Sequence, residues 1–159
     1  MDSTPQQKLR NERARFGLSG AADLVEKLHY DLQRLEVCGK ETRRRASVFT
    51  AMDCAATIVA LKDWINDERA DRGLPALPLE TSIPHFQVAR ELANGFKHRT
   101  VDRHNPKVRG FASGHVHLQS PNGEHVQFAW CGYDSETFTL LPLFREIATH
   151  LEKIISAGQ

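Results

Sequence analysis

The chain has 159 residues, of which 40% are hydrophobic and 26% charged, a composition that excludes a protein disordered throughout. Its 21 Lys and Arg residues nearly balance 20 Asp and Glu residues, and the net charge of +1 means that an anionic partner has to meet a local basic patch. No segment approaches the roughly 18 consecutive apolar residues of a membrane-spanning helix. The first residues carry no apolar leader, and the three cysteines lack the spacing of a zinc site. We therefore expect one cytoplasmic domain that needs no cofactor.

The chain begins with a polar and charged segment over residues 1–17, which predicts a flexible N-terminal arm before a single domain at residues 18–157. The first helix of that domain is expected from about residue 19 to residue 37, with Ser19 as its N-cap. Its apolar residues recur at helical spacing on one stripe: Leu24, Val25, Leu28, Leu32 and Leu35.

A second, longer helix is expected from about residue 41 to residue 72. Its middle is apolar on most sides, so we expect it to lie at the centre of the fold. Its apolar positions are Phe49, Met52, Ala56, Val59, Ala60 and Ile65, with Ala51 and Ala55 beside them.

Two further helices are expected toward the C-terminus. The third follows the proline-containing segment 74–79, with Ser82 as its N-cap and Pro84 in its first turn. Its expected buried face consists of Phe86, Ala89, Leu92, Ala93 and Phe96. The last helix covers about residues 140–156, with Thr139 at its N-cap. Its apolar residues form a wide stripe at helical spacing: Leu140, Leu143, Phe144, Ile147, Leu151, Ile154 and Ile155.

Residues 107–138 change from helical to alternating periodicity, which predicts a small antiparallel hairpin or meander inserted before the last helix. Val116 and Leu118 share a face with the apolar residues of the next strand only if the connecting loop has an odd number of residues. A three-residue loop over residues 121–123 meets this condition and places Leu118 opposite Val126. Short flanking strands are expected at residues 108–111 and 136–139. The predicted fold class is therefore mainly α: a four-helix bundle with a β insertion.

Three polar residues, Arg90, Asn94 and His98, recur four residues apart and so share one side of the third helix. A guanidinium, an amide and an imidazole in this order suit the binding and cleavage of a phosphodiester. In the structural alternative the same row braces the helices, with Arg90 paired to a carboxylate such as Asp63 and Asn94 bonded to backbone.

Two aspartates on the expected second helix, Asp53 and Asp63, are candidate partners for this polar row, whether its role is catalytic or structural. Asp53 lies in an apolar stretch, where a carboxylate without a partner is costly. We therefore expect Arg90 or His98 to reach one of the two. Such a pair either fixes the fold or tunes the pKa of a catalytic group.

The segment that follows the third helix is locally basic. Five cations against one acid give residues 97–109 a net charge of +4: Lys97, Arg99, Arg103, Lys107 and Arg109 against Asp102. Such a run can hold several phosphates of a nucleic acid, or it can be an ordinary solvated loop.

Three histidines of the expected hairpin, His115, His117 and His125, fall on its outward face. An His-x-His pair on one strand with a third His across from it is one way to hold Zn²⁺ or Ni²⁺. The alternative is a solvated sheet face that carries no metal.

Three segments resemble a group of small uncharacterised helical proteins from bacteria and mobile elements. They are Asp31-Leu-Gln-Arg-Leu, Leu61-Lys-Asp-Trp-Ile and Arg90-Glu-Leu-Ala-Asn-Gly-Phe-Lys-His. The similarity covers about residues 20–157 in the order of elements. It implies the fold rather than an activity.

The same layout also resembles the HEPN superfamily, whose members are helical bundles, often dimeric, and in many cases parts of toxin–antitoxin or anti-phage systems. Its catalytic members are metal-independent RNA endonucleases with an Arg, four to six residues, and then a His, a spacing that Arg99 and His104 share. The resemblance implies that His104 is the acid–base group and Arg99 the phosphate-stabilising group. Arg90 and His98 remain the alternative pair, and Lys97, Asn94 and Arg103 would contact the phosphate.

Two functions follow as expectations. The first is a metal-independent endoribonuclease, or its inactive relative, that works on RNA as a homodimer. The second is a non-catalytic module that binds a protein, such as an antitoxin or another component of a defence or mobile-element system.

Overall fold

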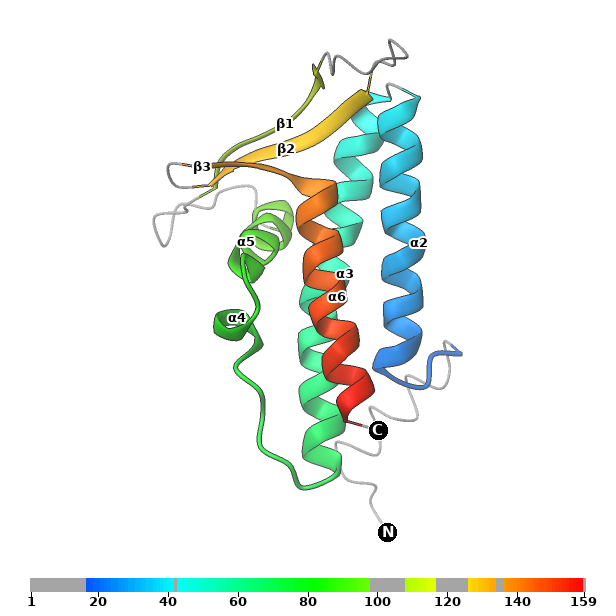
Figure 1. Cartoon of the computed structure of the whole chain (residues 1–159), viewed down its shortest axis with the longest axis vertical. Coiled ribbons are helices and arrows are strands. Elements are labelled where there is room, and N and C mark those ends of the chain that lie inside the picture. Colours follow the sequence, from blue (N-terminus) through cyan, green and yellow to red (C-terminus); the bar gives the residue numbers. More distant parts are fainter. Residues whose placement is uncertain (1–16, 42, 98–107, 117–125, 134–135, 159) are drawn as a thin grey trace.

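The computed structural model describes residues 17–41, 43–97, 108–116, 126–133 and 136–158, and this part of the protein is mainly helical, as the sequence predicts. Three long helices run side by side: α2 (Ala21–Lys40), α3 (Arg44–Asp71) and α6 (Leu140–Ala157) (Figure 1). The chain direction of α2 is opposite to that of α3 and α6. Because α3 contacts α2, α6 and the shorter α5 (Phe86–Lys97), its predicted central position is confirmed.

Helix α2 buries the stripe that its periodicity predicts. Leu24, Leu28, Leu32 and Leu35 are all buried, and Val25 packs against them. The helix start differs by one residue from the prediction, because the N-cap is Gly20 rather than Ser19. The carboxylate of Asp23 instead accepts hydrogen bonds from the backbone N–H of Ser19 and Gly20, at 2.5 and 3.2 Å, and from the Ser19 hydroxyl. These bonds lower the pKa of Asp23.

The structure buries only part of the apolar pattern of α3, whose middle the sequence predicts to be apolar on most sides. Small side chains at Ala51, Cys54 and Ala55 are fully buried, together with Ile58, Leu61 and Ile65. Of the predicted set, Ile65 is confirmed, whereas Met52, Val59 and Ala60 are half-buried and Phe49 and Ala56 are exposed. The physical reason is that helices approach most closely where side chains are small. The neighbouring helices therefore lie against the alanines and the cysteine of α3.

The connection from α3 to α5 also departs from the prediction. Residues 74–78 are non-helical, and the side chain of Asn66 exchanges two hydrogen bonds with the backbone of Leu77, at 2.8 and 3.2 Å. A one-turn helix, α4 (Leu79–Ser82), follows. The predicted start of the third helix at Ser82 is wrong, because His85 adopts a positive φ of 60° and interrupts the helix before α5.

The packing of α5 agrees with its predicted face where the side chains are described. Phe86, Ala89 and Leu92 are buried, and Val88 is buried beside them. At the start of α5, the ring of His85 lies 4.9 Å from the ring of Phe138. This contact holds the α4–α5 turn against the strand that precedes α6.

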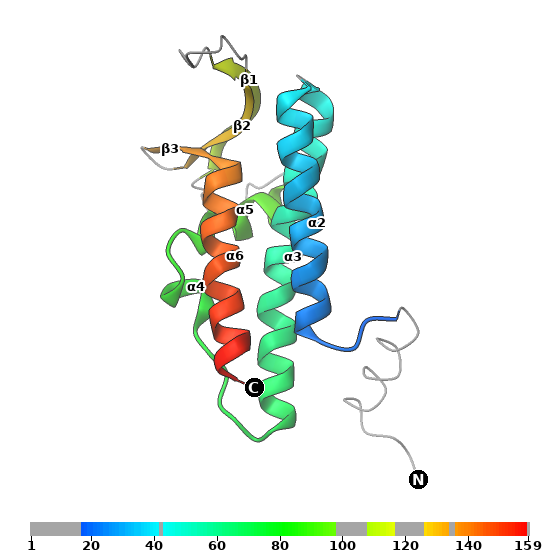
Figure 2. The same cartoon turned by 45° about the vertical axis from the view of Figure 1, so that its right-hand side comes forward.

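Three antiparallel strands lie across the end of the long helices where α2 ends and α6 begins (Figure 2). They are β1 (Val108–Val116), β2 (Val126–Tyr133) and β3 (Glu136–Thr139), in the order β1-β2-β3. Strand β1 therefore extends beyond the short strand expected at residues 108–111, while β3 matches its predicted range.

The pairing of β1 with β2 differs in register from the prediction. Val116 is opposite Val126, whereas the sequence placed Leu118 there. Leu118 and the predicted turn at residues 121–123 lie outside the described residues. A shift by two residues leaves every side chain on the same face, because the side-chain period of a strand is two. The apolar pattern therefore could not distinguish the two registers.

Helix α6 continues directly from β3. Thr139 occupies the N-cap position as predicted, although its side chain makes no capping hydrogen bond. The predicted apolar stripe is confirmed by the burial of Leu140, Leu143, Phe144, Ile147 and Leu151. None of the helices in the described ranges combines the length and the apolarity needed to cross a membrane.

Candidate functional site

The predicted polar row on α5 begins with Arg90, and the structure gives this arginine a different partner from the one expected. Its guanidinium Nη1 lies 2.5 Å from Oε2 of Glu80, on α4. The other carboxylate oxygen of Glu80 accepts a hydrogen bond from Nζ of Lys62, on α3, at 2.8 Å. The expected Arg90–Asp63 pair is wrong: Asp63 is exposed and its carboxylate lies 3.4 Å from Lys62.

Because Glu80 joins cations from two other helices, the cluster Lys62–Glu80–Arg90 connects α3, α4 and α5. The hydrogen bonds from Lys62 and Arg90 lower the pKa of Glu80, and the bond to Glu80 raises the pKa of Lys62. The charged forms of Glu80 and Lys62 are therefore favoured. The sequence missed Glu80 because α4 and the turn at His85, which bring it to Arg90, were not predicted.

The rest of the row is only partly within the described residues. Asn94 is exposed on α5, and Lys97 is the last residue of that helix. The remaining candidates of the phosphodiester site lie outside the described residues: His98, Arg99, Arg103 and His104.

The candidate metal site is not tested by the structure. His115 belongs to β1, whereas His117 and His125 lie outside the described residues. Within the part of the chain that is described, no group of three or more His, Cys, Asp or Glu side chains is placed to hold a metal ion.

Asp53 also has a different environment from the one expected. The prediction placed it among apolar side chains with Arg90 or His98 as its partner, but its side chain is half exposed and contacts Arg34 of α2 at 3.3 Å. The reason is that Asp53 lies on the side of α3 that carries Phe49, away from the buried alanines.

A buried carboxylate that the sequence analysis did not select as a site residue, Asp31, lies between α2 and α3 and is only 2% exposed. It accepts hydrogen bonds from Nζ of Lys27 at 2.5 Å and from the hydroxyl of Thr57 at 3.2 Å, and Nη1 of Arg34 lies 3.4 Å from its other oxygen. The Lys27 ammonium also donates to the Thr57 hydroxyl at 2.7 Å. Asp31 is thus fully engaged within the fold, as a buried charge has to be.

A sequence signal for Asp31 was present. It falls three residues after Leu28 and four residues before Leu35, within the apolar stripe of α2. The neighbouring thiol of Cys54 is buried, and burial together with the negative charges of Asp31 and Asp53 raises its pKa. Cys54 is therefore a thiol at neutral pH and not a nucleophile.

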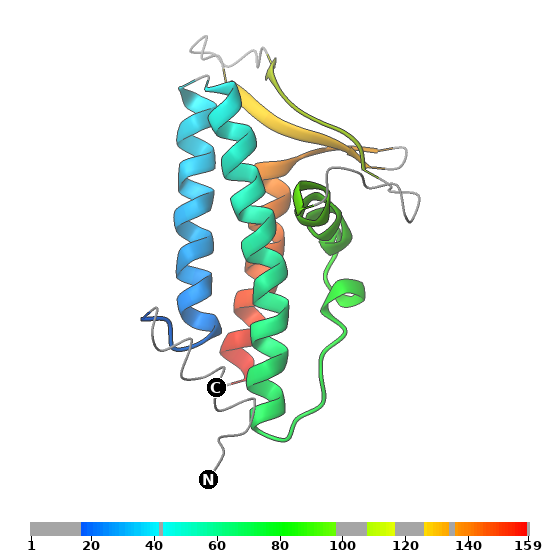
Figure 3. The same ribbon diagram turned by 180° about the vertical axis from the view of Figure 1, so that it is seen from behind.

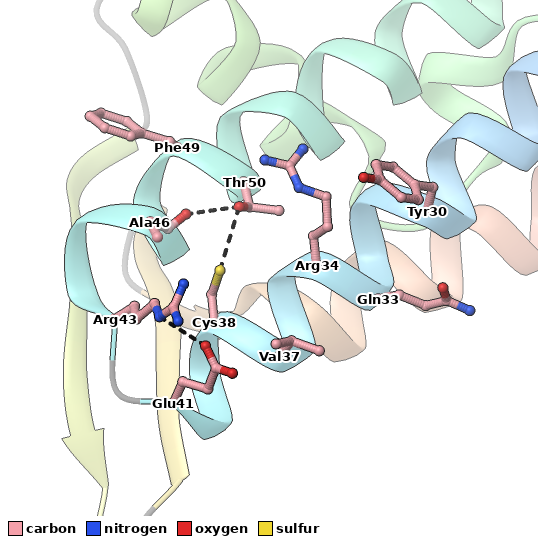
Figure 4. Close-up of a pocket in the computed structure, with 10 residues that line it drawn as sticks. All are labelled: Tyr30, Gln33, Arg34, Val37, Cys38, Glu41, Arg43, Ala46, Phe49 and Thr50. Atoms are coloured by element: carbon pink, nitrogen blue, oxygen red, sulfur yellow. Dashed lines mark hydrogen bonds and ion pairs between the residues drawn. The ribbon is translucent and has the colours of Figure 1, made fainter.

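The end of α2 and the start of α3 lie side by side (Figure 3). An open groove of about 500 Å³ lies between these two helix ends, and Figure 4 shows the side chains that line it. Its floor consists of Cys38, Ala46 and Thr50, and Figure 4 shows the Cys38 thiol and the Thr50 hydroxyl pointing toward one another, 3.9 Å apart. Its rim carries large side chains that are 50–62% exposed: Tyr30, Val37 and Phe49. We call this surface the α2–α3 groove.

Charged side chains surround the α2–α3 groove. Arg34 lies over the ring of Tyr30 and Arg45 over the ring of Phe49, each at 5.8 Å. Glu41 and Arg43 form an ion pair of 2.8 Å at one end of the groove. Exposed aromatic and arginine side chains around a floor of small residues are typical of the centre of a protein–protein interface.

The sequence missed this groove because Phe49 was assigned to the core. Tyr30 and Val37 are apolar residues outside the buried stripe of α2, and they were the available signal.

Comparisons with protein-family models, with curated proteins and with solved structures find no match for this chain.

Proposed function

We propose that the protein is a non-catalytic interaction module that docks another protein chain on the α2–α3 groove. The observation that carries this proposal is the gathering of Tyr30, Val37 and Phe49, each at least half exposed, around a floor of small side chains. Burying such large side chains against a partner removes apolar surface from water and favours association.

The environment of Arg90 supports a structural role for the polar row. Its guanidinium is engaged by Glu80, which in turn is held by Lys62, so the arginine connects α5 to the rest of the helices. An arginine paired in this way is less available for a phosphate, since the anion would compete with a carboxylate at 2.5 Å.

The proposed context is a bacterial defence or mobile-element system, with a HEPN-like four-helix bundle as its fold. On this proposal α2, α3, α5 and α6 are the four helices, and the contacts of α3 with the other three support it. The partner is then an antitoxin, another component of the same system or a second copy of the chain.

Site-specific photo-crosslinking in cells tests the docking surface. A photoreactive amino acid in place of Gln33, which is exposed and lines the groove, is expected to give an adduct with a protein. The same group in place of Ala70, exposed at the opposite end of α3, is the matched control and should give none. Absence of any adduct at Gln33, or equal adducts at both positions, would contradict the proposal.

A metal-independent endoribonuclease is the second candidate function, and the exposure of Asn94 on α5 favours it. In this mechanism the RNA 2′-oxygen attacks the adjacent phosphorus while the bond from phosphorus to the 5′-oxygen breaks, which gives a 2′,3′-cyclic phosphate and a free 5′-hydroxyl. His98 or His104 transfers the proton lost by the 2′-hydroxyl and gained by the 5′-oxygen, and Arg99 or Arg90 stabilises the developing charge. Asn94, Lys97 and Arg103 would orient the phosphate.

Purified protein incubated with single-stranded RNA in EDTA tests this candidate. Cleavage that is lost in His98→Ala or in His104→Ala would establish the endoribonuclease. Intact RNA, or cleavage that persists in both variants, would remove it and leave the interaction module.

A further inference from the structure

We infer that the chain docked on the α2–α3 groove is a second copy of this protein, related by a two-fold axis that crosses α2 and α3 at the level of Val37 and Phe49. This inference rests on the proposed function and names its partner. Three features carry it: the order of charges along α3, the order of charges along α2, and the way the two rows are aligned.

Helix α3 carries a row of three side chains on one line of its surface, Arg45, Phe49 and Asp53, spaced four residues apart. The exposed phenyl ring therefore has a cation about 6 Å to one side along the helix axis and an anion about 6 Å to the other side. Within its own copy Asp53 lies 3.3 Å from Arg34, and its side chain is half exposed, so its carboxylate can accept a second cation. When two such helices meet antiparallel at Phe49, Arg45 of each copy faces Asp53 of the other. Arg45 lies over the ring of Phe49. Among the described residues it forms no ion pair, so its guanidinium can pair with a carboxylate of the second copy.

Helix α2 repeats this arrangement around Val37. Arg34 precedes the exposed valine by three residues, and Glu41 follows it by four. Two α2 helices that meet antiparallel at Val37 therefore bring Arg34 of each copy beside Glu41 of the other. An interface in which the same patch supplies both members of every pair is isologous, the kind found in two-fold dimers.

The two rows are aligned so that one axis serves both. Cys38 and Thr50 are in contact across the helix pair at 3.9 Å. Because α2 and α3 run in opposite directions, Val37 and Phe49 lie about 3 Å apart along the helix axes, one on each side of this contact, so one axis at the level of the contact passes close to both. A two-fold axis parallel to the groove face and perpendicular to the helices then places α2 on α2 and α3 on α3, in the form of a four-helix bundle.

Shape and net charge agree with this arrangement. The groove has small side chains on its floor and large ones on its rim, so a second copy can place its rim side chains over the floor of the first. The net charge of +1 per chain gives little repulsion between copies. Positive and negative groups alternate around the groove, so a surface that carries charges of a single sign would not complement it.

Sedimentation velocity of the purified full chain at micromolar concentration tests the inference. The expected mass is twice the chain mass of 17.9 kDa. Phe49→Asp should give the single-chain mass with an unchanged circular dichroism spectrum, because Phe49 is exposed within its own copy. Leu74→Asp is the matched control: Leu74 is also an exposed large hydrophobic residue but lies outside the groove, and the variant should remain a dimer.

A charge exchange identifies the axis. Arg45→Asp alone and Asp53→Arg alone each place two like-charge pairs in the dimer and should raise its dissociation constant at least about tenfold. The double variant Arg45→Asp/Asp53→Arg restores opposite charges and should return most of the affinity. Failure of the double variant to recover any affinity would overturn the proposed axis.

The outcomes separate this inference from the proposed function. A wild-type protein that sediments as a single chain, together with a Gln33 adduct to a different protein, overturns the second copy and leaves the docking surface in place. A single chain with no adduct at Gln33 overturns both.

Discussion

Two clusters of charged side chains hold helices together in this protein, and in each a carboxylate lies between two cations. The cations beside Asp31 belong to its own helix, and the contact with α3 is made through the Thr57 hydroxyl, whereas the cations beside Glu80 come from two other helices. Asp31 lies between Lys27 and Arg34 at the α2–α3 contact, and its side chain is 3% exposed. Glu80 lies between Lys62 and Arg90, and its side chain is 27% exposed. The arrangement is similar, but the access of water differs.

This difference in burial decides what each cluster contributes. A carboxylate without water depends on its protein partners, so removing it leaves Lys27 and Thr57 without the acceptor around which they are arranged. A carboxylate that water still reaches can replace a lost partner with solvent, and its ion pairs are worth less. The Asp31 cluster therefore holds α2 against α3 more strongly than the Glu80 cluster holds α5.

The largest expected effect comes from the buried carboxylate. Asp31→Ala should lower the free energy of unfolding by about 2–3 kcal/mol, because it removes charge-assisted hydrogen bonds and opens a small cavity. Urea denaturation followed by circular dichroism measures the loss. Asp53→Ala, which removes the exposed member of the same group of charges, is the control and should cost under about 1 kcal/mol. If both variants lose the same free energy of unfolding, the burial of Asp31 does not make its contribution larger than that of the exposed Asp53.

An intermediate effect is expected at the half-exposed cluster. Arg90→Ala should lower the free energy of unfolding by about 1 kcal/mol, since Glu80 keeps Lys62 as a partner. The neighbouring Asn94→Ala is the control, and its stability should change by less than about 0.5 kcal/mol because Asn94 is exposed. If Arg90→Ala instead leaves stability unchanged and abolishes RNA cleavage, the arginine belongs to a catalytic site and not to a brace.

The smallest effect is expected in the acid dependence of stability. Hydrogen bonds from Lys62 and Arg90 lower the pKa of Glu80 below its ordinary value of 4.5, so the folded protein binds this proton less readily than the unfolded chain. The contribution of Glu80 is therefore present above about pH 4.5 and is lost as the pH falls through the lowered pKa. The difference in unfolding free energy between the wild type and Glu80→Gln should shrink by about 1 kcal/mol or less over that range. A difference that does not change with pH would show that the ion pairs of Glu80 contribute nothing.

The residue pattern alone was enough to predict the positions of α2 and α6 and the faces that they bury, and most of the buried face of α5. Leu24, Leu28 and Leu32 on α2 predicted their own burial because an apolar stripe at helical period is a local property of the chain. The central place of α3 could also be predicted from its apolar middle.

The partner of each polar side chain depends on how distant segments pack together, which no local residue pattern contains. Arg90 meets Glu80 because a positive φ at His85 turns α5 back onto α4, and no periodicity predicts that turn. Phe49 and Asp53 are exposed because the elements packed around α3 cover its small residues Ala51, Cys54 and Ala55 instead. A helical period fixes which residues share a face, but the shape of the neighbouring helices decides which face is buried.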